Sequence, residues 1–132
     1  MSLFDRFFRA ISSVLPSGLG TKETELLLQL NPHKVYVENV RSILGVSHRE
    51  AVRILETAVR QGAFTRLVEV RCPDGSVVAS AEREEDLPRT VHCWYEDDEG
   101  HLEETDINSQ LLRKSTFYRI NERERDTFQR TA

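Results

Sequence analysis

The sequence predicts a single α+β domain of 132 residues, with helices in its first half and antiparallel strands in its second. The strongest observation is the stretch 35–71, in which two helical patterns meet at a Gly-Val-Ser turn and the second pattern leads directly into a strand. β-Branched residues become frequent from Phe64 onward, and short Pro- and Gly-containing segments punctuate them as hairpin turns would. A chain of this length buries one substantial core, so one unit with appendages is expected.

An amphipathic helix is predicted for residues 1–16. Apolar side chains recur there at helical spacing, with Asp5, Arg6 and Arg9 on the opposite side. A Pro-Ser-Gly-Leu-Gly stretch ends the pattern, so residues 17–20 are expected to form a linker. The apolar face is the candidate partner-binding surface, and it consists of Leu3, Phe4, Phe7, Phe8, Ile11, Val14 and Leu15.

The segment 21–82 is predicted to hold three more helices and a hairpin. A helix over 21–30 is favoured by two glutamates near its N-terminus. The next helix spans 34–44 and is expected to end at Gly45. The first of these two helices is expected to bury Leu26, Leu27, Leu28 and Leu30.

The best-marked helix follows Ser47 and ends near Gly62. Ser47 is predicted to cap it, and Glu50 three residues later completes a Ser-x-x-Glu capping box. Its expected buried side consists of Ala51, Ile54, Leu55, Ala58 and Val59.

The opposite side of this helix is basic. Arg49, Arg53 and Arg60 fall within one narrow angular sector. Glu56 lies in the same sector and is expected to pair with Arg53 or Arg60, which would weaken the basic stripe.

Two hairpins and a last strand are predicted in the second half of the chain. A Pro-Asp-Gly turn separates the strands of the first hairpin, and an Asp-Asp-Glu-Gly turn separates those of the second. The expected strands are 64–71, 77–81, 90–96, 101–105 and 116–120.

The later hairpin belongs to a predicted β-rich extension, 83–120, which also contains a helical turn near 107–112. A polar tail, 121–132, follows and is expected to be disordered. Because neighbouring residues on a strand point to opposite faces, one of Trp94 and Tyr95 is expected in a core and the other in solvent.

Catalytic and metal chemistry have little support in this sequence. Cys72 and Cys93 occur without a CxxC or Cys/His cluster, so each is expected to be a small buried thiol, in neither a disulfide framework nor a zinc site. The four histidines are scattered, and no nucleophile–base grouping is visible. The acidic run 96–99 lacks the alternating ligands of a calcium loop, and no glycine-rich phosphate loop occurs. The chain is therefore not expected to be an enzyme, and no cofactor or metal is predicted.

Charge and hydropathy indicate where the protein is located and which half of it could bind nucleic acid. No apolar run approaches the roughly 18 residues of a membrane span. Charges at Asp5, Arg6 and Arg9 interrupt any secretory signal, so a cytoplasmic location is expected. Residues 1–82 carry ten Lys and Arg against nine Asp and Glu, whereas residues 83–132 carry eight against thirteen. Any nucleic-acid surface should therefore lie in the helical half.

The pattern L-G-V-S-x3-A-x3-L-x6-G-A-F at residues 44–64 resembles the winged helix-turn-helix family, and the resemblance covers residues 21–81. Gly45 allows the turn, Ala51 lets two helices approach, and Gly62 lets the chain leave the third helix. In such proteins the third helix enters the major groove and the wing contacts the backbone beside it. The resemblance implies DNA contacts by Ser47, His48, Arg49, Arg53, Thr57, Arg60, Arg66 and Arg71.

Two uses of this scaffold compete. The first is non-enzymatic binding of double-stranded DNA, as a transcription regulator and as a dimer whose symmetry doubles the base contacts. The acidic wing tip at Asp74 argues against it, as does the fact that most charged helix faces are simply solvated. The alternative is a protein-interaction adaptor, or a small subunit of a larger assembly, that docks a partner or a second copy through the N-terminal helix. That helix could instead pack on its own core or lie on a membrane surface, for which Arg6 and Arg9 supply little positive charge.

Overall fold

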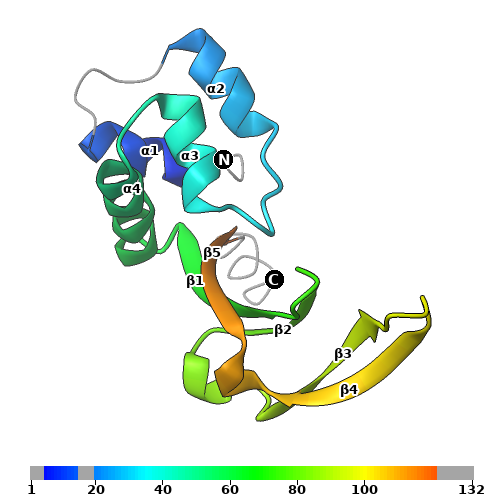
Figure 1. Cartoon of the computed structure of the whole chain (residues 1–132). Helices are drawn as coiled ribbons and strands as arrows, with labels where there is room; N and C mark the ends of the chain where they lie inside the picture. The colour runs from blue at the N-terminus through cyan, green and yellow to red at the C-terminus, as the bar shows by residue number, and fades with distance from the viewer. Residues whose placement is uncertain (1–4, 15–19, 122–132) are drawn as a thin grey trace, which may run out of the picture. The chain divides into compact units, whose positions relative to one another are not determined.

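The computed structural model describes residues 5–14 and 20–121, and in that part of the chain helices precede strands (Figure 1). The helices are α1 (Asp5–Val14), α2 (Thr21–Leu28), α3 (Val37–Leu44) and α4 (His48–Arg60). The strands are β1 (Phe64–Arg71), β2 (Val77–Ala81), β3 (Thr90–Glu96), β4 (Leu102–Asn108) and β5 (Arg113–Ile120), with short 3₁₀ turns at Glu84–Asp86 and Ser109–Leu111. The α+β class is therefore confirmed. The predicted tail lies outside the described residues, apart from Asn121.

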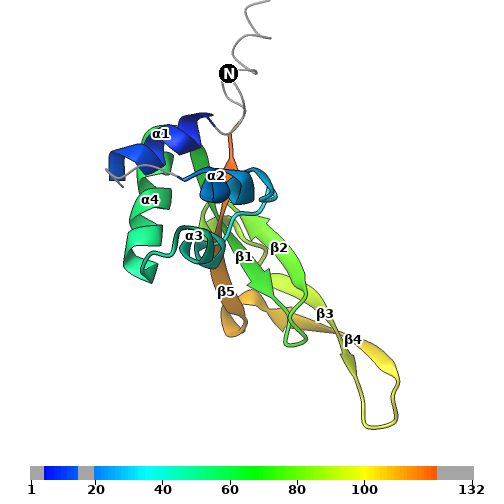
Figure 2. The same cartoon turned by 90° about the horizontal axis from the view of Figure 1, so that it is seen from above.

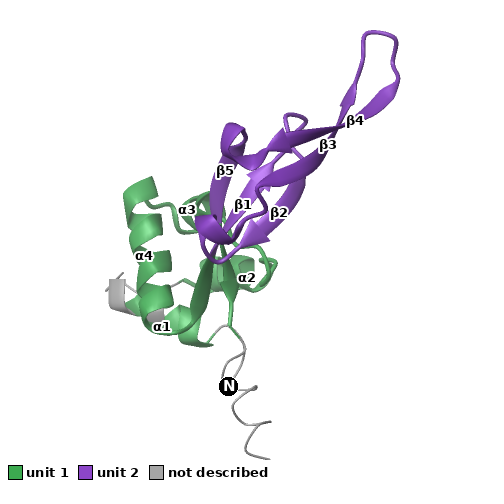
Figure 3. Ribbon diagram, turned by 90° about the horizontal axis from the view of Figure 1, so that it is seen from below, with its two compact units in different colours: residues 1–66, 117–132 green, residues 67–116 purple. Residues whose placement is uncertain are grey.

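The chain forms two compact units, which Figure 3 colours separately. Unit 1 comprises residues 1–66 and 117–132, and unit 2 comprises residues 67–116. The chain therefore leaves unit 1 within β1 and returns to it within β5, rather than changing unit at the expected boundary near residue 82. Hydrogen-bonded neighbours give one sheet the order β2-β1-β5, while β3 and β4 form a second, two-stranded sheet.

Unit 1 is built around an apolar core to which all four helices contribute. The Phe7 ring of α1 lies 4.6 Å, between centroids, from the Phe64 ring at the start of β1. Helix α1 also packs against α4, which it crosses at a steep angle in the view of Figure 2. The buried members of this core are Phe7, Ile11, Leu27, Val35, Val40, Ala51, Ile54, Leu55, Ala58, Ala63, Phe64, Tyr118 and Ile120.

Pairing with β5 makes one helix of unit 1 shorter than predicted. Val35 and Tyr118 exchange two backbone hydrogen bonds of 2.8 Å, so the chain is extended at Val35 and α3 begins only at Val37. The prediction of helix from residue 34 is wrong because this pairing partner lies far away in the sequence. In α2 only Leu27 is buried, whereas Leu26 and Leu28 are 37% and 50% exposed, against the expectation that all would be covered.

Unit 2 contains a cross-link that was not predicted. Cys72 and Cys93 form a disulfide, with their Cα atoms 5.6 Å apart, so the expectation of two separate thiols is wrong. The bond joins the residue after β1 to the middle of β3. Both cysteines are buried with Val91 in a small cluster, against which Ala79, Ile107 and Leu112 pack.

The β3–β4 hairpin extends beyond this small cluster. Its register pairs Thr90 with Asn108 at one end and Glu96 with Leu102 at the other. Side chains do alternate along β3, but the buried face ends at Cys93, so Trp94 and Tyr95 are 53% and 45% exposed. The expectation that one of these two aromatic rings lies in a core is therefore wrong.

Candidate functional site

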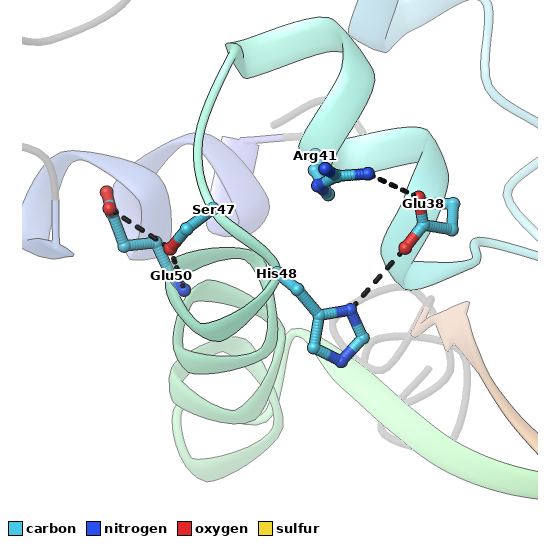
Figure 4. Close-up of polar contacts among 5 residues, drawn as sticks. All are labelled: Glu38, Arg41, Ser47, His48 and Glu50. Carbon is cyan, nitrogen blue, oxygen red and sulfur yellow. Dashed lines mark hydrogen bonds and ion pairs between the residues drawn. The ribbon is translucent and has the colours of Figure 1, made fainter.

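The turn between α3 and α4 sets the start of the candidate helix. Gly45 has a φ of 65°, a conformation that glycine adopts without steric penalty. Ser47 Oγ accepts a hydrogen bond of 3.1 Å from the Glu50 backbone N–H, which confirms the predicted N-cap. The Ser47 hydroxyl also donates to Glu50 Oε1 at 3.2 Å, so Glu50 is engaged with the cap (Figure 4).

Glu38 of α3 connects the two helices by polar contacts. It accepts a hydrogen bond from Arg41 Nη1 at 3.0 Å and lies 3.4 Å from His48 Nδ1 (Figure 4). These contacts, led by the hydrogen bond from Arg41 and followed by that from His48, lower the pKa of the Glu38 carboxyl. His48, one of the predicted DNA-contacting residues, is therefore oriented by Glu38 at the first turn of α4.

Arg49 and Arg53 present unpaired positive charge on α4. Both side chains are exposed, and within the described part of the chain neither makes a hydrogen bond or an ion pair. Arg60 is also exposed and donates to Thr57 Oγ1 at 3.0 Å. At about 1.5 Å rise per residue, Arg49 and Arg60 lie roughly 16 Å apart along the helix axis.

Glu56 does not neutralise this stripe. Its Oε2 accepts a hydrogen bond of 2.6 Å from the Tyr118 hydroxyl, and its Oε1 lies 3.2 Å from Arg66 Nη2. The prediction that Glu56 pairs with Arg53 or Arg60 is therefore wrong. The buried Tyr118 hydroxyl requires an acceptor, and Glu56 supplies it. Burial, followed by the hydrogen bond to Glu56, raises the pKa of Tyr118.

The two arginines predicted for the wing are both engaged by carboxylates. In unit 1, Arg66 pairs with Glu56 as described above. In unit 2, Arg71 Nη2 lies 2.8 Å from Glu69 Oε1, and its Nη1 donates to the Gly75 carbonyl at 2.9 Å. The described site therefore concentrates its available positive charge on α4 rather than on these two residues.

The apolar residues of α1 have a different place from the one expected. Phe7 and Ile11 are fully buried, and Phe8 packs against the same core of unit 1. Phe7 and Ile11 were predicted to contact a partner, and the alternative that the helix packs on the core of its own chain holds for these two residues. Leu3, Phe4 and Leu15 lie outside the described residues, as does the side chain of Val14.

The other described residues do not indicate a metal site or a membrane-spanning segment. No group of three or more His, Cys, Asp or Glu side chains in residues 5–14 and 20–121 is arranged to hold a metal ion. None of the helices in those residues has the length and apolar character that crossing a bilayer requires. An open polar pocket of about 480 Å³ in unit 2 is lined by Glu84, Glu85, Leu87, Arg89, Ser109, Gln110 and Lys114. Comparisons with protein-family models, curated proteins and solved structures give no match.

Proposed function

We propose that this chain is a non-enzymatic, regulatory protein that binds double-stranded DNA through the exposed face of α4. The observation that carries the proposal is the pair Arg49 and Arg53, which are exposed and lack partners in the described residues because Glu56 is engaged elsewhere. Arginine donors of this kind bond phosphate oxygens and the O6 and N7 atoms of guanine.

The order of elements supports a winged helix-turn-helix arrangement as part of the same proposal. Helices α2, α3 and α4 are followed by the β1–β2 hairpin, and a short extended segment at Val35 precedes α3. Helix α4 lies at the edge of unit 1 in Figures 1 and 3, and the side chains of Arg49, Arg53 and Arg60 on it are exposed. Because the wing arginines are paired, we expect the contacts of α4 to supply most of the affinity.

The test is binding to a mixed-sequence DNA duplex over a salt series, measured by fluorescence anisotropy. Replacing Arg49 and Arg53 together with alanine should lower the affinity at least tenfold in low salt and make its salt dependence less steep, since two phosphate contacts would be lost. The matched control is Arg89→Ala with Arg113→Ala, which removes two exposed arginines from unit 2 and should change affinity less than about twofold. Unchanged affinity of the α4 variant in low salt would overturn the proposal.

The proposal includes a dimer and a cytoplasmic location. Light scattering on the same samples gives the mass, and a monomer that binds duplex DNA would remove the dimer from the proposal. The Cys72–Cys93 bond bears on the location, because disulfides persist mainly in oxidising compartments. Quenching thiols in intact cells before extraction would show which redox state the protein has there, and a fully oxidised pair would count against the cytoplasm.

The alternative function, docking of a partner through α1, loses part of its support. Phe7 and Ile11 belong to the apolar face that was predicted to bind a partner. Both are fully buried in unit 1, so neither is available for docking.

A further inference from the structure

The outer part of the β3–β4 hairpin exposes an apolar patch. Trp94 pairs across the hairpin with Glu104, and Glu96 pairs with Leu102, so Trp94 and Leu102 are diagonal neighbours on one face. Their exposed fractions are 53% and 71%. This exposure shows that no other described element covers the two side chains, which lie on the two-stranded β3–β4 sheet.

The same face carries negative charge without positive charge. Residues 90–108 contain seven Asp and Glu and no Lys or Arg. Because residues two apart on a strand share a face, Glu96, Glu104 and Asp106 lie on the side of Trp94. His92 is on this side as well, and its Nδ1 contacts Asp106 and lies 3.3 Å from Glu104 Oε1. The carboxylates therefore surround the apolar patch with a negative potential.

We propose that this face, the Trp94 face, docks a basic polypeptide segment. A Lys or Arg head group is attracted both to the face of an indole ring and to nearby carboxylates. The aliphatic stems of the same side chains can cover an apolar side chain such as Leu102. A second copy of the hairpin would bring like charges together, and a nucleic-acid backbone would be repelled by them. A basic polypeptide satisfies both the apolar and the charged part of the surface.

Trp94 is the only tryptophan of the chain, so its emission reports directly on this face. The probe is a peptide that is rich in Lys and Arg and free of aromatic residues, titrated into the full chain. We expect a saturable change in Trp94 emission that weakens as salt increases. A peptide with glutamine at every Lys and Arg position should give no change.

The discriminating variant is Glu104→Gln with Asp106→Asn, which leaves the reporter in place. It should weaken peptide binding at least tenfold, since it removes two of the carboxylates around Trp94. The matched control, Glu84→Gln with Glu85→Gln, removes the same charge from exposed positions elsewhere in unit 2 and should change binding less than twofold. With a labelled peptide, Trp94→Ala should lower affinity by about fivefold through loss of the cation–π contact.

Several results would overturn this proposal. The first is the absence of a saturable response. The second is an equal loss of binding in the control variant, which would show an effect of net charge alone. A change of emission with protein concentration alone would indicate that a second copy covers the face, and a response to duplex DNA would assign the face to nucleic acid. The variant Arg49→Ala with Arg53→Ala should keep the full peptide response, which separates this surface from the proposed DNA site.

Discussion

Unit 1 and unit 2 are stabilised in different ways. The core of unit 1 is a continuous apolar cluster in which Phe7, Phe64 and Ile54 are each no more than 2% exposed. The cluster that includes Cys72 and Cys93 in unit 2 has only one other buried member, Val91. Because a segment of this size buries little apolar surface, a covalent bond supplies part of what packing supplies in unit 1. Apolar packing and a covalent cross-link therefore stabilise different stretches of the same chain.

The largest loss of stability is expected from Phe7→Ala, in the core of unit 1. Removing a fully buried phenyl ring from the core of unit 1 should lower the free energy of unfolding by about 3–5 kcal/mol. Urea denaturation monitored by circular dichroism measures it. The control Leu26→Ala alters a side chain that is 37% exposed and should have a much smaller effect. A loss below about 1 kcal/mol for Phe7→Ala would show that α1 does not pack as described.

Breaking the disulfide should affect unit 2 selectively. Replacing Cys72 and Cys93 with serine opens a link between residues separated by 21 positions, and should cost about 3 kcal/mol. Hydrogen exchange resolved by residue should then show faster exchange in β3 and β4 and unchanged exchange in α3 and α4. Equal acceleration of exchange in the helices would show that the two units unfold together, so the disulfide would not stabilise unit 2 alone.

A smaller effect is expected from the cap of α4. Ser47→Ala removes the acceptor of the Glu50 N–H and should lower the free energy of unfolding by about 1 kcal/mol. Ser42→Ala, at an exposed position within α3, is the control and should be near neutral. If both variants had the same stability as the parent chain, the cap would contribute nothing measurable to unit 1.

The smallest effect is expected from Tyr118→Phe, and it depends on pH. Losing the hydrogen bond to Glu56 should cost less than about 1 kcal/mol near neutral pH, because Glu56 keeps its ion pair with Arg66. Folding raises the pKa of Tyr118 above its ordinary value of 10.0, so the neutral phenol stabilises the fold below pH 10. As pH rises above about 10, the unfolded chain releases this proton first, and stability falls.

The pH dependence of stability provides the control for Tyr118→Phe. Denaturation between about pH 9 and pH 11 should show a steeper loss of stability in the parent chain than in Tyr118→Phe. Parallel curves would mean that Tyr118 has the same pKa in the folded and unfolded states.

Local signals explain which features the sequence allowed us to predict. The Ser47 cap, the Gly45 turn and strand β3 are each encoded within a few neighbouring residues, and the structure confirms them. The disulfide joins residues 21 positions apart, and Glu56 meets Tyr118 across 62 positions, so no local pattern contains either contact. Likewise, the apolar periodicity of α1 showed that one face would be covered, but not that unit 1 itself covers it.

The passage of the chain through β1 and β5 bears on whether the two units can be separated. Strands β1 and β5 are neighbours in one sheet, so the chain leaves and re-enters unit 1 on adjacent strands. Residues 67–116 are thus an insertion between the two chain segments of unit 1. A chain in which a short turn joins Arg66 to Phe117 would test whether unit 1 folds without residues 67–116.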